Sequence, residues 1–226
     1  MKRVNQNQAG FTMVELMVVI GIIGLLTLFA IPVFQDAGRG GRLRTAIFQV
    51  NANLSLARQN AITSRQRVVM LLPDDAPDLD ASKAFRQYAL YGNRDGYMTD
   101  WLELPQGIVF DPDVAATAGE LPRNIFTLQH GGAGGNEIFL ADEVHFPNND
   151  GPQRELFALG FRPDGRIFVG GVVNPTLYLA EGWTEYDPDS GVFDNIFVHE
   201  DLPLRGITVN ALTGQSIIRE FQRNND

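Results

Sequence analysis

The chain has 226 residues, contains no cysteine and carries a formal net charge of −9. Its length suits one globular domain with one additional element. The lack of cysteine excludes a disulfide framework, a thiolate metal site and a cysteine-linked lipid anchor, so the domain must be stabilised by its own hydrophobic core.

The charge is unevenly distributed along the chain. Between Ala37 and Pro73 there are six arginines and no acidic residue. From Asp74 to Asp226 there are ten basic and 25 acidic residues, so this part has a net charge of about −15. A basic segment followed by an acidic one is compatible with simple solvation of both. It is also compatible with attraction between neighbouring copies in an assembly.

An apolar segment near the N-terminus predicts the additional element. From Leu16 to Phe34 there is no charged side chain. As a helix these residues would extend roughly 28 Å, close to the hydrocarbon core of a bilayer at about 30 Å. We therefore expect one membrane span. Glu15 lies at its edge, where a carboxylate is disfavoured by about 2.5–3.5 kcal/mol or less, so we expect Glu15 to have a partner.

The first residues differ from an ordinary secretory signal. Lys2 and Arg3 give a basic start, but the apolar run is too long and no small-residue cleavage pattern follows it. Small and polar residues instead precede the run, at positions 5–10. The pattern predicts a processing junction before the apolar segment, which would then remain in the mature protein.

The segment Gly-Phe-Thr-Met-Val-Glu-Leu, which begins at Gly10, and the apolar run after it resemble the type IV prepilin N-terminal signature. This family includes type IV pilins and the pseudopilins of type II secretion. The resemblance implies a leader at residues 1–10, cleaved by the prepilin peptidase between Gly10 and Phe11, and N-methylation of Phe11. It also implies an assembly helix at residues 11–35. The assembly residues that it implies are Thr12, Glu15, Leu16 and Pro32.

Two roles for Glu15 follow from physical chemistry. Cleavage would leave a positive amine on Phe11 at the positive end of a helix dipole, and Glu15 could offset that charge in its own chain or in a neighbouring one. The local alternative is a capping box, with Thr12 as the N-cap, Glu15 three residues later, and Phe11 and Leu16 as a hydrophobic staple. The spacing alone leaves both roles open, and the resemblance favours subunit docking.

Charge counting and the resemblance disagree about orientation. Arg39, Arg42 and Arg44 follow the apolar run while only Lys2 and Arg3 precede it, so the positive-inside rule would place the C-terminal part in the cytoplasm. The resemblance implies the opposite, because the leader must face a cytoplasmic peptidase. We expect a single pass through the inner membrane with the head in the periplasm.

A second helical segment is predicted at residues 36–66. Apolar side chains recur there at spacings of three and four, which is typical of an amphipathic helix. These residues are Leu43, Ile47, Val50, Leu54, Ala57 and Ala61. Three glycines at positions 38–41 predict a bend or a break before this stripe. The arrangement is similar to the long N-terminal helix of pilin-like proteins.

Residues 67–226 predict a β-rich head, because short apolar runs alternate with turn residues. The fold class we expect is therefore α+β, with the long helix packed on an antiparallel sheet. The predicted strands are Val68–Leu72, Arg86–Tyr91, Gly107–Phe110, Phe157–Phe161, Ile167–Val173, Thr176–Ala180, Asn195–His199, Gly206–Asn210 and Ser216–Arg219. Pro73–Ser82 and His130–Gly135 are predicted loops.

Three segments resemble the GspH/FimT group of minor pseudopilins. The first is Leu56–Ala61 leading into the strand at Val68. The second is the Phe-Arg-Pro-Asp-Gly turn at Phe161–Gly165, and the third is the closing hairpin at Gly206–Gly214. Residues 73–155 show no such likeness, and their role is not indicated by the sequence.

The head shows no pattern for catalysis or for cofactor or metal binding. There is no cysteine and no Gly-x-Ser-x-Gly motif. His130, His145 and His199 are widely spaced, which favours ordinary surface or core histidines. The acidic segment Tyr186–Gly191, with Asp194 beyond it, fails the spacing of a calcium-binding EF-hand loop, so a solvated turn is the preferred interpretation.

These observations favour a structural subunit, a minor pseudopilin or pilin-like protein, over an enzyme. Its expected partners are the prepilin peptidase/N-methyltransferase, other pilin or pseudopilin subunits and inner-membrane lipid. One rival is a membrane-tethered periplasmic enzyme or receptor, which would need a polar pocket with convergent titratable groups. The other is a DNA-binding minor pilin, which the acidic head disfavours because DNA binding depends on Lys and Arg.

Overall fold

A computed structural model of the chain describes residues 12–73, 83–112, 114, 140–167, 174–187, 189, 193–199 and 204–221. Within these ranges the side chains of residues 28–40, 140–143 and 155 are not described. The chain divides into two compact units, Met1–Gly41 and Arg42–Asp226.

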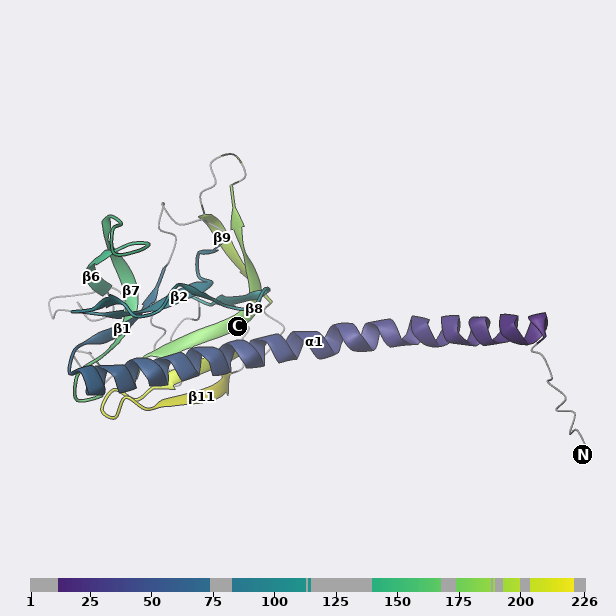
Figure 1. Ribbon diagram of the computed structural model, residues 1–226, viewed down its shortest axis with the longest axis horizontal. Helices are drawn as coiled ribbons and strands as arrows, with labels where there is room; N and C mark the ends of the chain where they lie inside the picture. Colours follow the sequence, from purple (N-terminus) through teal and green to yellow (C-terminus); the bar gives the residue numbers. More distant parts are fainter. Residues whose placement is uncertain are drawn as a thin grey trace, which may run out of the picture. The chain divides into compact units, whose positions relative to one another are not determined.

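The helix α1 runs from Met13 to Ser64 (Figure 1). No break interrupts it at residues 38–41, and a bend at these glycines stays a prediction. Where side chains are described, no helix is both long enough and apolar enough to cross a membrane. The last part of the predicted span, residues 28–34, lies outside those side chains.

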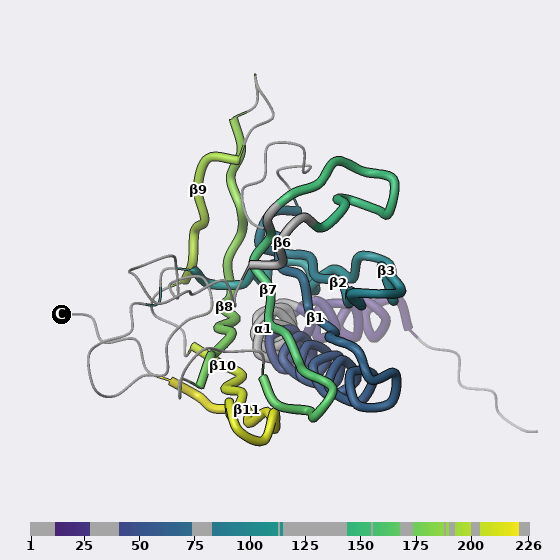
Figure 2. Tube along the Cα trace, turned by 90° about the vertical axis from the view of Figure 1, so that its left-hand side faces the viewer, coloured from purple at the N-terminus to yellow at the C-terminus, as the bar shows by residue number. Residues whose placement is uncertain are grey.

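In the second unit, one face of α1 forms the centre of the core. The predicted stripe is confirmed, since all six of its side chains are buried, together with Ala46. The stripe packs in one cluster with residues of two sheets, including Met70 and Leu159 from the first and Leu179 and Ile207 from the second. Figure 2 shows strands of both sheets around this part of the helix.

In the described residues the head forms two antiparallel sheets and not the single sheet that the sequence predicted. The first has the order β3-β2-β1-β7-β6, and β4 also pairs with β2. Its strands are β1 (Val68–Leu72), β2 (Gln87–Gly92), β3 (Gly96–Tyr97), β4 (Leu102–Glu103), β6 (Leu140–His145) and β7 (Gln153–Phe161).

The second sheet has the order β11-β10-β8-β5, and β9 pairs with the outer half of β8. Its strands are β5 (Ile108–Phe110), β8 (Thr176–Tyr186), β9 (Phe193–Val198), β10 (Leu204–Val209) and β11 (Ser216–Phe221). In Figure 1 the β8–β9 hairpin projects beyond the rest of this sheet.

Strand β1 lies at the centre of the first sheet and is buried on both faces. Val68, Met70 and Leu72 join the cluster beneath α1, while Leu71 joins a second cluster on the opposite face. Phe146 belongs to that second cluster, where its ring lies edge-on to the Trp101 ring with 5.3 Å between the ring centroids. A strand covered on both sides has an uninterrupted apolar sequence, which explains why Val-Val-Met-Leu-Leu was predicted with its correct bounds.

Every predicted strand except Ile167–Val173 overlaps an observed one. Ile167 forms an isolated bridge to Phe161, and residues 168–173 lie outside the described residues. The predictions missed β3, β4 and β6, and they began β7 four residues late. The predicted loop at 130–135 and most of that at 73–82 also lie outside the described residues.

Three tyrosines lie in environments that oppose ionisation. Burial raises the pKa of Tyr88 and of Tyr97 above the ordinary value of 10.0, and it raises the pKa of Tyr178 to about 12. The Tyr88 hydroxyl also accepts a hydrogen bond from Asn53 Nδ2 of α1, at 3.1 Å. This contact adds a specific polar link to the apolar packing of helix on sheet.

The stripe on α1 predicts a position-dependent effect of leucine truncation. Leu54→Ala should lower the free energy of unfolding by about 2–5 kcal/mol, because Leu54 is fully buried between the sheets. Leu56→Ala is the matched control on the same helix, since Leu56 is 42% exposed, and it should change stability by about 0.5 kcal/mol or less. Urea unfolding of the full chain measures both, and equal losses would contradict the packing.

The buried phenols predict a loss of stability in alkali. Because their pKa values in the folded state are raised, unfolding releases phenolic protons only above pH 10, the ordinary pKa. The free energy of unfolding should therefore be unaffected by these groups below pH 10 and fall as the pH rises towards 12. Urea unfolding across this range should show a smaller fall for Tyr178→Phe, and an unchanged fall would contradict the assignment.

Candidate functional site

The start of α1 is capped locally. The Thr12 hydroxyl Oγ1 accepts a hydrogen bond from the Glu15 N–H at 3.2 Å, and the Thr12 carbonyl accepts one from the Leu16 N–H, also at 3.2 Å. Thr12 is therefore an N-cap, as the spacing predicted. The Glu15 side chain is exposed and, among the described residues, makes no hydrogen bond or ion pair. The cap thus uses the backbone of Glu15 and leaves its carboxylate available.

The first turns of α1 expose apolar side chains in all directions. Their exposed fractions range from 44% at Val19 to 79% at Met13. The set comprises Met13, Val14, Leu16, Met17, Val18, Val19, Ile20, Ile22, Ile23, Leu25 and Leu26. Exposed apolar surface costs about 25 cal/mol per Å², and a contiguous patch of this kind marks an interaction surface. This helical surface is therefore built to be covered by something outside the described chain.

The polar and small residues of this surface fit an apolar environment. Thr27 donates its hydroxyl to the Ile23 carbonyl at 2.8 Å, so its polar group is satisfied within the helix. At Gly21 and Gly24, apart from the neighbouring backbone of the same helix, no atom lies within 4 Å of the position that a Cβ would take. Two such positions three residues apart leave room for the backbone of another helix to approach closely.

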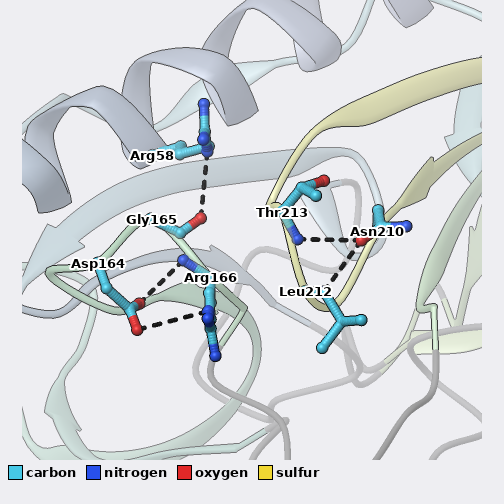
Figure 3. Close-up of polar contacts among 7 residues, drawn as sticks. All are labelled: Arg58, Asp164, Gly165, Arg166, Asn210, Leu212 and Thr213. Carbon is cyan, nitrogen blue, oxygen red and sulfur yellow. Dashed lines mark hydrogen bonds and ion pairs between the residues drawn. The ribbon is translucent and has the colours of Figure 1, made fainter.

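In the head, α1 is fixed by a polar junction as well as by the core (Figure 3). The Arg58 guanidinium Nε donates to the Gly165 carbonyl at 3.1 Å. A Cβ on Gly214 would lie 1.9 Å from that carbonyl oxygen and 2.9 Å from Arg58 Nε. Gly165 and Gly214 also have φ angles of +78° and +66°, which favour glycine. Both turns therefore need glycine in order to approach Arg58.

Side chains within each turn hold this junction in place. Asn210 Oδ1 accepts from the backbone N–H groups of Leu212 and Thr213, each at 3.0 Å. Asp164 Oδ1 accepts from the Arg166 N–H at 3.1 Å. The structure thus brings together the three segments whose sequences resemble the GspH/FimT group. The signal for their contact was the pair of glycines that end the second and third segments.

Several residues singled out in the sequence cannot be placed at this site. Gly10, Phe11 and His130 lie outside the described residues, so the cleavage junction and the staple are untested. Pro32 lies within α1, but its side chain is not described.

The remaining polar candidates have local roles. His145 Nδ1 lies 2.7 Å from the Gly151 carbonyl oxygen. The His199 ring packs edge-on against the Trp183 ring, with 5.6 Å between the ring centroids. Asp187 Oδ1 accepts from the Asp189 N–H at 2.9 Å, which closes a turn. In the ranges that the structure describes, no three His, Asp or Glu side chains are grouped so that they could hold a metal ion.

Comparison with known proteins supports the motif at the N-terminus. The family described as "Prokaryotic N-terminal methylation motif" matches residues 5–31. Two proteins named "Fimbrial protein", both from Pseudomonas aeruginosa, are 40% identical to the chain over 62 residues. The similar region covers 27% of this chain and 40% of each fimbrial protein, so the chain spans less than half the length of these relatives. No solved structure matches the chain significantly.

The methylation motif directly precedes and enters the exposed apolar helix, and the head behind it is an α+β domain with antiparallel sheets. Together with the likeness to fimbrial proteins, these findings support a type IV pilin-like protein.

Proposed function

We propose that this protein is a structural subunit, a minor pseudopilin or pilin-like protein, of a type II secretion or type IV pilus filament. One observation carries the proposal: the first turns of α1 expose apolar side chains on every side, and a single carboxylate, Glu15, lies at their start. Packing such helices against one another removes the apolar surface from water. The subunit acts by assembly and not by chemical conversion.

Processing prepares the helix for this assembly. The prepilin peptidase cleaves between Gly10 and Phe11, and Phe11 is then N-methylated. The match of the methylation motif to residues 5–31, which include this junction, supports the step. Cleavage removes the basic residues Lys2 and Arg3 and leaves a positive amine on Phe11.

Glu15 is the partner of that new amine. Its carboxylate is not used by the local cap, because the Thr12 hydroxyl bonds the backbone of Glu15. A lone carboxylate among apolar side chains is costly unless an opposite charge compensates it, and the amine of a neighbouring subunit supplies that charge as the helices pack. The pair then fixes the stagger between subunits.

Before assembly, residues 11–35 anchor the subunit in the inner membrane in a single pass, with the head in the periplasm. The uncharged stretch Leu16–Phe34 supports this location, as does the internal bonding of the Thr27 hydroxyl. The filament then replaces lipid around the helix with the helices of other subunits.

Within the pilin-like proteins we assign the chain to the GspH/FimT type. The junction of Arg58, Gly165 and Gly214 supports the assignment, because the three segments that resemble the group meet there. Such contacts fix the helix to the head, as a subunit needs if its helix is to carry the head into a filament.

Variants of Glu15 and Thr12 separate the two roles proposed for this turn. Glu15→Ala and Glu15→Gln should leave processing largely intact but impair assembly, because both remove the charge while Gln preserves the capping pattern. Thr12→Ala should retain assembly and lose about 0.5–2 kcal/mol of helix stability. Cross-linking and sedimentation of assembled subunits measure these outcomes. Normal assembly of Glu15→Gln would contradict a docking role for the Glu15 charge.

The mature N-terminus gives an independent test. Intact-mass and peptide mass spectrometry of the protein from its native membrane should show a chain that starts at methylated Phe11. A chain that retains Met1 in fully assembled protein would contradict the proposed processing.

A further inference from the structure

A basic pocket lies where α1 ends and β1 begins. Its volume is about 470 Å³, and its lining includes Arg65, Gln66, Arg67, Asn93, Arg94 and Arg162. The volume falls within the range of about 300–1,000 Å³ that is usual for ligand pockets. All four arginines are exposed, so the pocket presents guanidinium groups to solvent. Proteins use such groups for bidentate binding of carboxylates and phosphates.

The strand register explains why these residues meet. In the first sheet, Val68 of β1 lies opposite both Gly92 of β2 and Phe161 of β7, in antiparallel pairing. The residues just before Val68 and just after Gly92 and Phe161 therefore lie at the same end of these three strands. The Asn93 N–H donates to the Arg67 carbonyl at 3.0 Å, which continues the pairing past the strands.

A buried glutamine fixes the base of the pocket. Gln66 is 3% exposed, and its Oε1 accepts from the Arg94 N–H at 3.0 Å. Its Nε2 donates to the Asp95 carboxylate. The side-chain amide of Gln66 lies 3.1 Å from the position that a Cβ on Gly92 would take, so the strand packs closely against it. The backbone that carries Arg65 and Arg94 is therefore ordered by a side chain with both of its polar atoms in use.

The charge of the pocket contrasts with the rest of the head. From Asp74 onward the chain has ten basic and 25 acidic residues, whereas this pocket gathers four arginines. In the part of the chain that the structure describes, no ion pair engages Arg65 or Arg94. Like charges brought close together repel one another until an anion binds between them.

An acidic surface of the same head has the complementary charge. The end of the β8–β9 hairpin carries exposed Glu185, Asp187, Asp189 and Asp194. Tyr186 beside them is 49% exposed. Figures 1 and 2 both show this hairpin projecting away from the end of α1, where the pocket lies.

We propose that the arginine pocket of one copy binds the acidic end of the β8–β9 hairpin of a second copy. The contact joins two different surfaces, so it is head-to-tail, and a head-to-tail contact that does not close into a ring extends into a filament. This contact adds an interaction between heads to the proposed filament, and it rests on that proposed function. Helix packing raises the local concentration of the heads, so a modest head contact is enough.

Charge reversal with rescue tests this contact in the full chain. Sedimentation velocity in detergent measures self-association, which should weaken at high salt. Arg94→Glu and Asp189→Arg, each alone, should raise the apparent Kd at least about tenfold, or 1.4 kcal/mol. An equimolar mixture of the two variants should regain association, because the reversed pocket meets the reversed hairpin. Arg219→Glu and Asp100→Arg are matched controls at exposed positions and should associate as the unchanged chain does.

Circular dichroism and thermal unfolding show whether each variant folds, and Arg65→Glu replaces Arg94→Glu if the latter does not. Failure of the mixture to regain association would overturn the proposal, as would equal weakening by the control variants. Preferential loss of binding to a duplex oligonucleotide in Arg94→Glu, with self-association unchanged, would assign the pocket to nucleic acid instead. The proposed function is tested separately, because the Glu15 variants leave both head surfaces intact.

Discussion

The head depends on burial of a single stripe of α1. Leu43, Ile47, Val50, Leu54 and Ala61 pack into one cluster with strands of both sheets, although the sheets are separate hydrogen-bonded units. Central strands such as β1 can be apolar on both faces because the helix covers one face and a second cluster covers the other. Everything at the periphery, including the polar junction and the arginine pocket, is positioned by elements that this stripe holds in place.

The same helix has two different surfaces along its length. From Leu43 to Ala61 the apolar residues follow the helical period and are buried within the chain. From Met13 to Leu26 they occupy all sides and remain exposed among the described residues. Specific polar contacts then set geometry at both ends: Thr12 starts the helix, and Arg58 ties its far half to the turn at Gly165.

The sequence predicts the structure correctly where the signal is local and periodic. The stripe on α1, the N-cap at Thr12 and the bounds of β1 follow from spacing within a few residues. The prediction fails where that signal is weak: β3 and β4 have two residues each, and the pairing of β6 with β7 shifts register between Ala141 and Val144. A two-residue strand has no period to detect, and a bulge removes the alternation that identifies a strand.

The sequence by itself determined the long helix, the motif at Gly10 to Glu15, the β-rich character of the head and the division between a basic segment and an acidic one. Only the tertiary structure decided that there are two sheets, that Arg58 meets Gly165 beside Gly214, and that Arg65, Arg94 and Arg162 line one pocket. The helical period and the charge of a segment can be predicted from residues that are close together in the sequence. The contacts among these distant residues depend instead on the antiparallel register between segments about a hundred residues apart. That register is established only when the common core forms.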